Sequence, residues 1–552
     1  MVRLWSRFRR QSAVAVVLSS VSNMAYSLAL PSIPLDRLAS HANSYASANG
    51  LQIEAKNDDG ISVYQCAPIS LLPNAYPREA FQQAQELAGP FNELVDRISR
   101  DGDFLKETLG GGVAEADPYT GKLLQLYEQI YMNEQFNYAQ SADRLGIHRS
   151  DYMLNAKEGD SSDEYELKQV ELNTIAASFA GLASNVANLH RHLTGRFASQ
   201  VQELLSSNKN IIAGSTDPSP DDGVPQSPAL TCIPEAMAIA HQRYKERYVA
   251  KEDGEANPIV LFVVQEGETN TVDQRMLEFR LWELYDIPVV RMSLTRAETD
   301  LHYDETNGQI YVETEGTRQQ VAVVYFRAGY APTDYPDGYD GVEWKWREQI
   351  ERSVATKCPS LGYHLAGTKK VQQELARPGV LERFFPDEPD KVGAMREAFA
   401  GLYSLGSDAT DQDLAAVRDV VESNAEGRYV LKPQREGGGY NYYGQDLAEK
   451  LKANVGVGND GTLTLDKELA EFILMERLFP PKQPAVLLRS GKVEGTGDSI
   501  SELGCFGALV VSNEGEVVHN KYAGFLLRTK FSNVDEGGVA SGFATLSSPY
   551  LC

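Results

Sequence analysis

Apolar residues recur every three or four positions in three parts of the N-terminal half of the chain. This spacing predicts amphipathic helices over 80–100, 123–131 and 185–205. The pattern instead predicts strands over 64–73 and 167–172. We therefore expect helices and strands to be mixed in this half.

A stretch with four prolines, 213–228, predicts a surface loop or linker. After it the pattern predicts a strand at 259–264, a helix at 271–284, and strands at 288–291 and 321–326. This alternation is typical of a small α/β unit of about a hundred residues.

The last third of the chain continues the alternation. A helix is predicted to begin within 367–376, a strand at 428–433 runs into three glycines, and a helix follows at 446–453. Further predicted strands are 472–475, 485–488 and 505–511. We therefore expect an α/β (α+β) fold without internal repeats.

The net charge narrows the choice of partners. The 552 residues include 52 Lys and Arg against 77 Asp and Glu, a net charge of −25. A chain of this length with ordinary globular composition predicts several domains. The acidic excess argues against nucleic acid, because binding a phosphate backbone needs many basic groups. An anionic ligand would have to be met by a local pocket of a few Lys and Arg.

The first 35 residues differ from the rest of the chain. Four arginines within the first ten residues precede a charge-free, serine-rich stretch, and the first acid is Asp36. The apolar run 13–18 is too short for a bilayer, which needs about 20 residues, so we expect no membrane segment. An organelle transit peptide and a disordered tail are equally favoured, and secretion less so. With five scattered cysteines and no C-x-x-C pair, we expect a cytoplasmic protein, with a mitochondrion or plastid as a second location.

The segment 429–439, Tyr-Val-Leu-Lys-Pro-Gln-Arg-Glu-Gly-Gly-Gly, carries the most specific chemical signal. Lys432 at a strand end would set a positive charge beside a phosphate, and glycine amides can close on phosphate oxygens. Glu436 would offer a carboxylate oxygen to Mg²⁺. Lys369, at the start of another predicted helix, is also placed to reach a phosphate. The alternative is a glycine hairpin turn, but such turns seldom need three successive glycines.

Glu171 and Asn173 lie at the end of the predicted strand 167–172. Strand alternation puts both side chains on one face, and their oxygens suit Mg²⁺. A polar strand end is an equally good interpretation of these two residues by themselves.

A second group of charges lies near the C terminus. Arg528 and Lys530 share a face of an extended segment, and the acidic, small-residue loop 535–540 follows. This arrangement resembles a site for an anionic ligand and a small partner, and a solvated basic pair is the alternative. Glu502 is either a further metal ligand or a charge at a strand edge.

Several common catalytic motifs are missing. The chain has no G-x-S-x-G, H-E-x-x-H or kinase H-R-D segment, and His190 and His192 are predicted to be surface or cap groups. A reaction that needs only Mg²⁺, cations that bind phosphate, and positioning would leave this pattern, as phosphoryl transfer does.

Five segments together resemble eukaryotic glutathione synthetase. They are Val170-Glu-Leu-Asn-Thr-Ile-Ala-Ala-Ser-Phe179, Val323-Val-Tyr-Phe-Arg327, Leu365-Ala-Gly-Thr-Lys-Lys-Val-Gln-Gln-Glu-Leu375, Lys432-Pro-Gln-Arg-Glu-Gly-Gly-Gly439 and Leu526-Leu-Arg-Thr-Lys530. The segments keep the order of the family, and the similarity runs from Ile61 to Pro549.

The resemblance implies a circularly permuted ATP-grasp fold in a homodimer. It also implies that γ-glutamylcysteine is joined to glycine through an acyl phosphate, with ATP as co-substrate and Mg²⁺ as cofactor. The implied domains are a targeting peptide or disordered tail (1–35), the N-terminal part of the ATP-grasp body (36–256), the substrate-binding domain (257–367), and the C-terminal ATP-grasp region (368–552) with a mobile lid at about 399–497.

The resemblance further implies roles for residues at matching positions. Catalytic roles fall to Arg528, Lys369 and Lys432, and Mg²⁺ ligation to Glu171, Asn173 and Glu436. Nucleotide contacts would come from Glu171, Lys369, Lys432, Pro433, Gln434, Arg435, Glu436, Gly437, Gly438, Gly439, Tyr440, Asn441, Tyr443, Met475, Glu476, Arg477, Leu478, Glu502, Lys530 and Glu536. Substrate contacts would come from Arg149, Ile175, Ala176, Ala177, Ser178, Glu268, Thr269, Asn270, Gln274, Arg327, Ala328, Gly329, Tyr330, Arg528, Val539 and Ala540.

Four positions depart from the family pattern. Tyr440 stands where Asn is common, Ala176 replaces a Ser, and Glu536 falls where an Asp contacts the nucleotide. Ser541 replaces an Ala in the loop that frames the acceptor amine, which leaves glycine, β-alanine and serine open as acceptors. The alternatives are therefore a homoglutathione synthetase that uses β-alanine and a catalytically silent ATP-binding protein.

Overall fold

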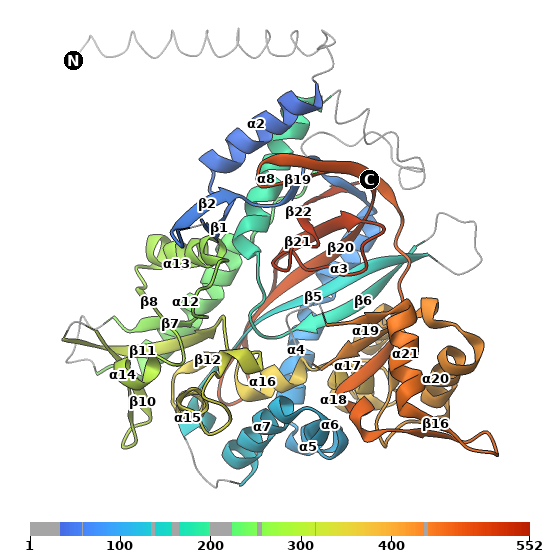
Figure 1. Cartoon of the computed structure of the whole chain (residues 1–552). Helices are drawn as coiled ribbons and strands as arrows, with labels where there is room; N and C mark the ends of the chain where they lie inside the picture. The colour runs from blue at the N-terminus through green and yellow to red at the C-terminus, as the bar shows by residue number, and fades with distance from the viewer. Residues whose placement is uncertain are drawn as a thin grey trace.

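A sheet of 13 strands runs through the molecule, as the computed structural model shows for residues 34–57, 59–133, 138–156, 165–198, 223–250, 257–314, 316–434 and 440–552 (Figure 1). Its path is β19 (Gln483–Arg489), β3 (Ile69–Ser70), β22 (Thr545–Ser547), β21 (Val517–Phe531), β20 (Lys492–Val511), β5 (Arg144–Ala156), β12 (Thr356–Cys358), β11 (Thr317–Phe326), β10 (Gln309–Thr314) and β9 (Leu301–Asp304). Beside this path, β6 (Tyr165–Asn173) pairs with β5, and β7 (Ile259–Val263) pairs with β11 and β8 (Val289–Met292). The fold class is therefore α/β, as the sequence predicts.

Both faces of this sheet are buried, because its strands carry apolar side chains on each side. On β20, Leu503 and Cys505 belong to one core cluster, and Phe506 and Ala508 belong to the other. The first face is covered by α3 (Arg78–Glu86), α4 (Ala88–Ser99), α5 (Gly102–Leu109) and α7 (Pro118–Tyr127). The opposite face is covered by α2 (Leu35–Ala48), α8 (Ala180–Arg196), α12 (Ala229–Tyr248) and α13 (Thr271–Tyr285). The result is a layered α/β body.

Shorter elements complete this body. Its remaining helices are α6 (Gly112–Ala116), α14 (Ala297–Asp300), α15 (Val342–Arg352), α16 (Leu361–Ala366), α17 (Lys369–Leu375), α18 (Val380–Phe384) and α19 (Pro389–Ala398), with a π-helical turn η1 (Glu128–Asn133) and short 3-10 turns. Two-stranded pairs of the body are β1 (Gln52–Lys56) with β2 (Ser62–Cys66) and β4 (Asn74–Tyr76) with β23 (Pro549–Leu551), whereas the pair β16 (Val455–Val457) with β17 (Leu463–Leu465) belongs to a second, smaller lobe.

A small second sheet forms the orange lobe of Figure 1. Its strands are β13 (Leu402–Ser404), β18 (Phe472–Glu476), β14 (Tyr429–Pro433) and β15 (Tyr442–Tyr443), and α20 (Asp411–Ser423) and α21 (Gly444–Asn454) pack on it. This lobe has its own apolar core, which includes Val417 and Leu447. It meets the large sheet at β6, where Lys432 Nζ donates a hydrogen bond to Val170 O over 3.1 Å.

Most elements predicted in the second half are confirmed. The strands predicted at 259–264, 288–291, 321–326, 428–433, 472–475, 485–488 and 505–511 correspond to β7, β8, β11, β14, β18, β19 and β20. The helices predicted at 271–284, 367–376 and 446–453 correspond to α13, α17 and α21. In the first half, 167–172 lies within β6.

Some predictions for the first half need correction. Proline accounts for two of them, because it lacks the backbone donor that helices and sheets use. The helix predicted over 80–100 divides at Leu87 into α3 and α4, with Pro90 in the first turn of α4, and Pro68 lies between β2 and β3 in the predicted strand 64–73. Strand β5 was not predicted, since most of its residues are buried on both faces and no alternation is visible.

The prediction for His190 also needs correction, and several predicted segments lie outside the described residues. The sequence predicts His190 as a surface or cap group, yet it lies inside helix α8, is fully buried and forms hydrogen bonds with Ser548 Oγ and Ser70 O. The helix predicted over 185–205 is α8, and its predicted part beyond 198 lies outside the described residues, as do 213–222 of the loop and 1–33 of the N-terminal segment. Among the described residues, no helix is both long and apolar enough to cross a bilayer.

Candidate active site

A cavity of about 290 Å³ lies between the small sheet and the strands β5, β6, β20 and β21 of the large sheet. It is lined by basic, acidic and small residues from segments far apart in the chain. Of the residues predicted to form a site, it brings together Arg149, Glu171, Asn173, Ile175, Ala176, Ser178, Tyr330, Lys369, Lys432, Pro433, Tyr440, Asn441, Tyr443, Met475, Glu476, Arg477, Leu478, Glu502, Arg528, Lys530, Glu536, Val539 and Ala540.

Strand pairing explains how the charged side chains meet. In the antiparallel ladder, Glu171 on β6 lies opposite Asp151 on β5, and Glu502 on β20 lies opposite Arg528 on β21. Opposite residues on neighbouring antiparallel strands present their side chains on the same face. Alternation along β21 adds Lys530 to that face, since it lies two residues beyond Arg528.

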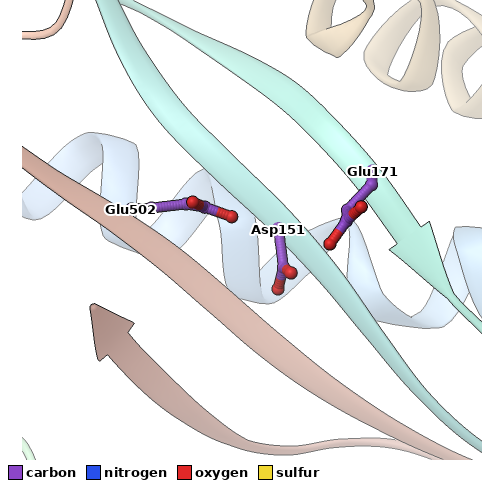
Figure 2. A group of neighbouring side chains, drawn as sticks. All are labelled: Asp151, Glu171 and Glu502. Atoms are coloured by element: carbon purple, nitrogen blue, oxygen red, sulfur yellow. The ribbon is translucent and has the colours of Figure 1, made fainter. Parts of the chain in front are cut away.

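Three carboxylates lie close together at the floor of the cavity: Glu171 and Glu502 line it, and Asp151 is fully buried beside them. One oxygen each from Asp151, Glu171 and Glu502 lies within 4.8 Å of the others, and Figure 2 shows the groups reaching toward one another from neighbouring strands. Asn173, also at the cavity, donates its Nδ2 to Arg149 O over 3.1 Å and to Asp151 Oδ2 over 3.0 Å. Both amide hydrogens are thereby engaged, and the Asn173 Oδ1 remains as an oxygen ligand. Carboxylate and amide oxygens form the donor set that Mg²⁺ prefers.

Cations surround these acids and change their ionisation. Lys369 Nζ lies 2.9 Å from Glu171 Oε2. Burial alone would raise the pKa of Glu171, but the charges of Lys369, Lys432 and Arg528 outweigh it and hold that pKa well below its usual value. Burial also lowers the pKa of Lys432 to about 8, although Glu171 opposes this shift. Lys432 therefore loses its proton more readily than an ordinary lysine.

The second acid of the cluster behaves in the opposite way. Burial raises the pKa of Glu502, and the negative charges of Asp151 and Glu171 add to this, while Arg528 opposes it. Arg528 donates hydrogen bonds from Nη2 to Glu502 Oε1 and, over 2.7 Å, to Asp151 Oδ2. Acidic and basic side chains therefore lie close together at the cavity floor. This arrangement is suited to binding an anion and a cation side by side.

Loop 535–541 closes one side of the cavity. Lys530 Nζ donates hydrogen bonds to the carbonyl oxygens of Asp535 and Glu536. Arg477 from the small lobe lies 2.5 Å from Asp535. Val539 is buried, whereas Ser541 is exposed and lines the cavity, so the departure from the family pattern at Ser541 faces the cavity.

The segment 175–179 is held in an unusual conformation against the cavity. Ala176 and Phe179 have φ values of 50° and 73°, in the left-handed region that is unfavourable for residues with a Cβ atom. Asp273 fixes the end of this loop, because its carboxylate accepts hydrogen bonds from the backbone N–H groups of Phe179, Gly181 and Leu182. The loop is therefore pinned to helix α13.

A group of predicted substrate residues lies beside the cavity rather than on its lining: Ala177, Glu268, Thr269, Asn270, Gln274, Arg327, Ala328 and Gly329. Arg327 still reaches the loop, donating to Ala177 O over 2.9 Å and to Ser178 Oγ. Glu268 accepts hydrogen bonds from Asn270 N and Gln274 Nε2, both over 2.7 Å. These residues form a polar network around the lining.

The glycine-rich segment is only partly described. Arg435, Glu436, Gly437, Gly438 and Gly439 lie outside the described residues, and their predicted roles stay predictions. Pro433, Tyr440 and Asn441 on either side line the cavity. Gln434 is not on the lining, because its side chain turns away and its Oε1 accepts a hydrogen bond from Lys370 N over 2.8 Å.

Sequence reasoning missed one acid of the cluster. Asp151 is fully buried, and two residues before it lies Arg149, the predicted substrate contact, so both lie on the same side of strand β5. An Arg-x-Asp pair in a strand was the available signal. The pair indicates a shared face only if its segment is a strand, and the hydrophobic pattern does not predict strand β5.

The chain is similar to known proteins over most of its length. The family model described as eukaryotic glutathione synthase, ATP binding domain, matches residues 33–551. A chloroplastic glutathione synthetase of Solanum lycopersicum is 39% identical over 525 residues, covering 94% of this chain and 84% of that protein. The glutathione synthetases of Dictyostelium discoideum and Homo sapiens are 36% and 37% identical, covering 94% of this chain and 99% and 97% of those proteins.

A solved structure resembles the chain in its fold. A glutathione synthetase-like effector from Globodera pallida, in its apo form, superposes with a TM-score of 0.68 at 23% identity, covering 94% of this chain and 97% of that chain. At this level of identity the likeness concerns the fold alone.

Proposed function

The chain belongs to the eukaryotic glutathione synthases, and we propose that the cavity between its two sheets is where it joins γ-glutamylcysteine to glycine with ATP. Its activity is that of an ATP-dependent carbon-nitrogen ligase, glutathione synthase. The observation that supports this location is the meeting of Lys369, Lys432, Arg528 and Lys530 with acidic side chains in one cavity. We take the architecture to be the permuted ATP-grasp fold of the family.

We propose that ATP lies between β14 and β18 of the small sheet and the floor of the cavity. Lys369 and Lys432 are both buried beside Glu171, so they are available to the phosphates at the inner end. The backbone of Met475 to Leu478, with Tyr443, lines the part of the cavity that would hold the base. Lys530 and Glu536 would complete this contact.

The described residues fit an Mg²⁺ ion. Glu171, Asn173 and Glu502 each present an oxygen at the cavity, and we propose Glu171 and Asn173 as ligands together with Glu436. When bound, Mg²⁺ would neutralise phosphate charge and hold the phosphates in line for transfer. Glu171 is kept ionised by its lysine neighbours, as its lowered pKa indicates, and is therefore ready to serve as a ligand.

The chain's own residues have two tasks in the reaction. Arg149, Arg327 and Ser178 would bind γ-glutamylcysteine, whose carboxylate attacks the γ-phosphorus of ATP and releases ADP. Lys369, Lys432 and Arg528 would stabilise the negative charge that gathers during this step. The amine of glycine then attacks the acyl phosphate, forms the amide bond and releases phosphate. Neither step needs a protein nucleophile, because positioning and electrostatics supply the acceleration.

We propose that the small sheet and the helices packed on it, within the segment of about 399–497, act as the lid, whereas β19 and the start of β20 in that segment belong to the large sheet. The sheet itself spans Leu402–Glu476, and its separate core would allow it to move as a unit. Closing it over the cavity would exclude water, which would otherwise hydrolyse the acyl phosphate.

We also propose that the protein is a homodimer. Strand β2, with Ile61 just before it, and helix α13 carry a set of exposed apolar side chains, which we call the β2–α13 patch: Ile61, Val63, Tyr64, Phe279, Trp282 and Tyr285. The two elements are joined through β1, because Thr271 Oγ1 donates to Glu54 Oε2 over 2.6 Å. Exposed apolar patches of this kind mark protein interfaces. Trp282→Glu should shift the sedimentation coefficient to that of a monomer, whereas Val457→Glu, at an equally exposed site on β16, should not.

For location we propose the cytoplasm, with import into an organelle through residues 1–35. Relatives from Solanum lycopersicum and Arabidopsis thaliana are described as chloroplastic, which supports a plastid as that organelle. Fusing residues 1–35 to a fluorescent protein tests this proposal, and uniform cytoplasmic fluorescence would contradict the import.

The decisive experiment measures ADP release with ATP, Mg²⁺ and γ-glutamylcysteine, adding glycine, β-alanine or serine in separate reactions. We expect turnover with glycine, and the ratio of the three rates reports the effect of Ser541. Faster turnover with β-alanine would make the enzyme a homoglutathione synthetase. ATP binding without ADP release in any reaction would leave only a silent ATP-binding protein.

A further inference from the structure

The Asp151 carboxylate connects three parts of the proposed site. Its Oδ1 accepts a hydrogen bond from Arg149 Nε over 2.7 Å, and its Oδ2 accepts one from Arg149 Nη2 over 2.9 Å. Oδ2 also accepts from Asn173 Nδ2 over 3.0 Å and from Arg528 Nη2 over 2.7 Å. These donors come from β5, from its neighbour β6 and from β21, which lies beyond β20, so one buried side chain joins three strands of the sheet.

Each donor has a different task in the proposed function. Arg149 would bind the dipeptide, Asn173 would offer its Oδ1 to Mg²⁺, and Arg528 would stabilise charge at the acyl phosphate. Asp151 is fully buried, so it reaches these groups and not the bulk solvent. Its oxygens already take four hydrogen bonds, which leaves little capacity for ligating a metal directly.

The neighbouring strand is built to leave room for this carboxylate. Gly504 on β20 lies opposite Asp151 on β5. A Cβ atom at position 504 would lie 2.6 Å from Asp151 Oδ1 and 2.8 Å from Arg149 Cδ, closer than real Cβ atoms come to other atoms. Any residue other than glycine at 504 would therefore displace the bidentate pair of Arg149 and Asp151.

We propose that Asp151 is a positioning residue for this ligase: it fixes the side chains of Arg149, Asn173 and Arg528 in the relative geometry that the dipeptide and the transferred phosphate require. This inference rests on the proposed function of the cavity. Bidentate pairing sets the plane of the Arg149 guanidinium as well as its position. A displacement of about 1 Å in such a group can lower the rate about 100-fold.

The test uses the full-length enzyme and four variants. Asp151→Asn keeps the size of the side chain and removes its charge, and Arg149→Lys tests the substrate assignment itself. Gly504→Ala crowds the pair without changing any polar group. Gly497→Ala is the matched control, because it lies on the same strand and its added Cβ would make only ordinary contacts, 3.5 Å from Phe531.

We expect Asp151→Asn to lower kcat/KM for γ-glutamylcysteine about 100-fold, with a higher KM and a lower kcat. Gly504→Ala should lower it about 10-fold, and Gly497→Ala should stay within about twofold of the wild type. Affinity for ADP, measured without divalent metal, should change less than about threefold in Asp151→Asn, because the hydrogen bonds of Asp151 go to Arg149, Asn173 and Arg528, which we assign to the dipeptide, Mg²⁺ and the acyl phosphate.

Three results would overturn the inference. The first is near-normal kinetics of Asp151→Asn. The second is an equal loss of ADP affinity and of thermal stability, which would mark a purely structural role. The third is an unchanged KM for the dipeptide with a raised Mg²⁺ requirement, which would make Asp151 a metal ligand. Two other outcomes would contradict the proposed function and not this inference. An inactive wild type would contradict the function itself, and a fully active Arg149→Lys would contradict the assignment of Arg149 to the substrate.

Discussion

Lys369 Nζ lies 2.9 Å from Glu171 Oε2, although the two residues are 198 positions apart in the chain. Lys369 is the first residue of helix α17, and Glu171 lies near the end of strand β6. The pair therefore ties a helix start to the edge of the large sheet. It also holds the cation that we propose to bind phosphate beside the carboxylate that we propose to bind Mg²⁺.

The first prediction concerns this pair. Glu171→Gln keeps an oxygen in place but removes the charge that offsets Lys369 and Lys432. We expect kcat to fall about 100-fold and the Mg²⁺ concentration for half-maximal rate to rise about 10-fold. ADP release measured against Mg²⁺ concentration checks both values. An unchanged Mg²⁺ requirement would place the metal elsewhere in the cavity.

The second prediction concerns Arg528. Arg528→Ala should abolish turnover, because no other guanidinium reaches Asp151 Oδ2 and Glu502 together in the described part of the cavity. Arg528→Lys keeps a charge but cannot reproduce the guanidinium geometry, so we expect about a 10- to 100-fold loss. Steady-state kinetics measure the loss.

Circular dichroism and gel filtration provide the control for these variants. The fold should survive Arg528→Ala, because Glu502, whose pKa burial already raises, can take up a proton when its partner is removed. Arg528→Ala with near-normal activity would show that the anion site lies elsewhere.

The third prediction concerns pH and His190. Burial lowers the pKa of His190 from 6.5 to about 4, and the hydrogen bond to Ser70 O only partly opposes this. The unfolded chain therefore binds the proton more readily than the folded protein, so this contribution to stability is present above pH 6.5 and is lost as the pH falls toward 4. The shift corresponds to about 3 kcal/mol.

His190→Gln tests that contribution, since glutamine can keep one donor and one acceptor for Ser70 and Ser548. We expect the difference in unfolding free energy between wild type and variant to shrink by up to about 3 kcal/mol between pH 7 and pH 4. Urea unfolding at a series of pH values measures it. A difference that does not change with pH would mean that His190 ionises in the folded protein as it does in the unfolded chain.

The fourth prediction concerns a connection between the body and the small lobe. Lys370 of helix α17 is buried and donates to Ser404 Oγ over 2.8 Å and to Asp408 Oδ2 over 2.5 Å. Asp408→Asn should lower stability by about 1–2 kcal/mol, because Lys370 keeps its charge and loses the carboxylate that offsets it. Thermal unfolding checks this. Asp411→Asn, at an exposed site in the same segment, is the control and should have a clearly smaller effect.

The sequence predicted those parts of the site that depend on local geometry. The shared faces of Glu171 with Asn173, and of Arg528 with Lys530, follow from alternation within a single strand, and all four side chains line the cavity. Lys369 was expected at a helix start, and it is the first residue of α17. Such features need no knowledge of distant partners.

What escaped prediction depends on contacts between distant segments. Asp151 is important because β5 pairs with both β6 and β20, and Gly504 matters only through that pairing. His190 is buried because Ser70 and Ser548, far away in the chain, supply its hydrogen bonds. Gln434 turns from the cavity because Lys370 offers it a backbone donor. None of these partners can be identified from periodicity.

The pairing of β5 with β20 also sets when the site can form during synthesis. Asp151 leaves the ribosome 377 residues before Arg528, its partner on β21. At typical elongation rates this is a delay on the order of 20 to 75 s. During that time β5 lacks its neighbour β20 and exposes a strand edge on which chaperones could act. A nascent chain interrupted before Arg528 carries Arg149, Asp151 and Glu171 but no assembled site, so activity should appear only after translation has passed the last strands of the sheet.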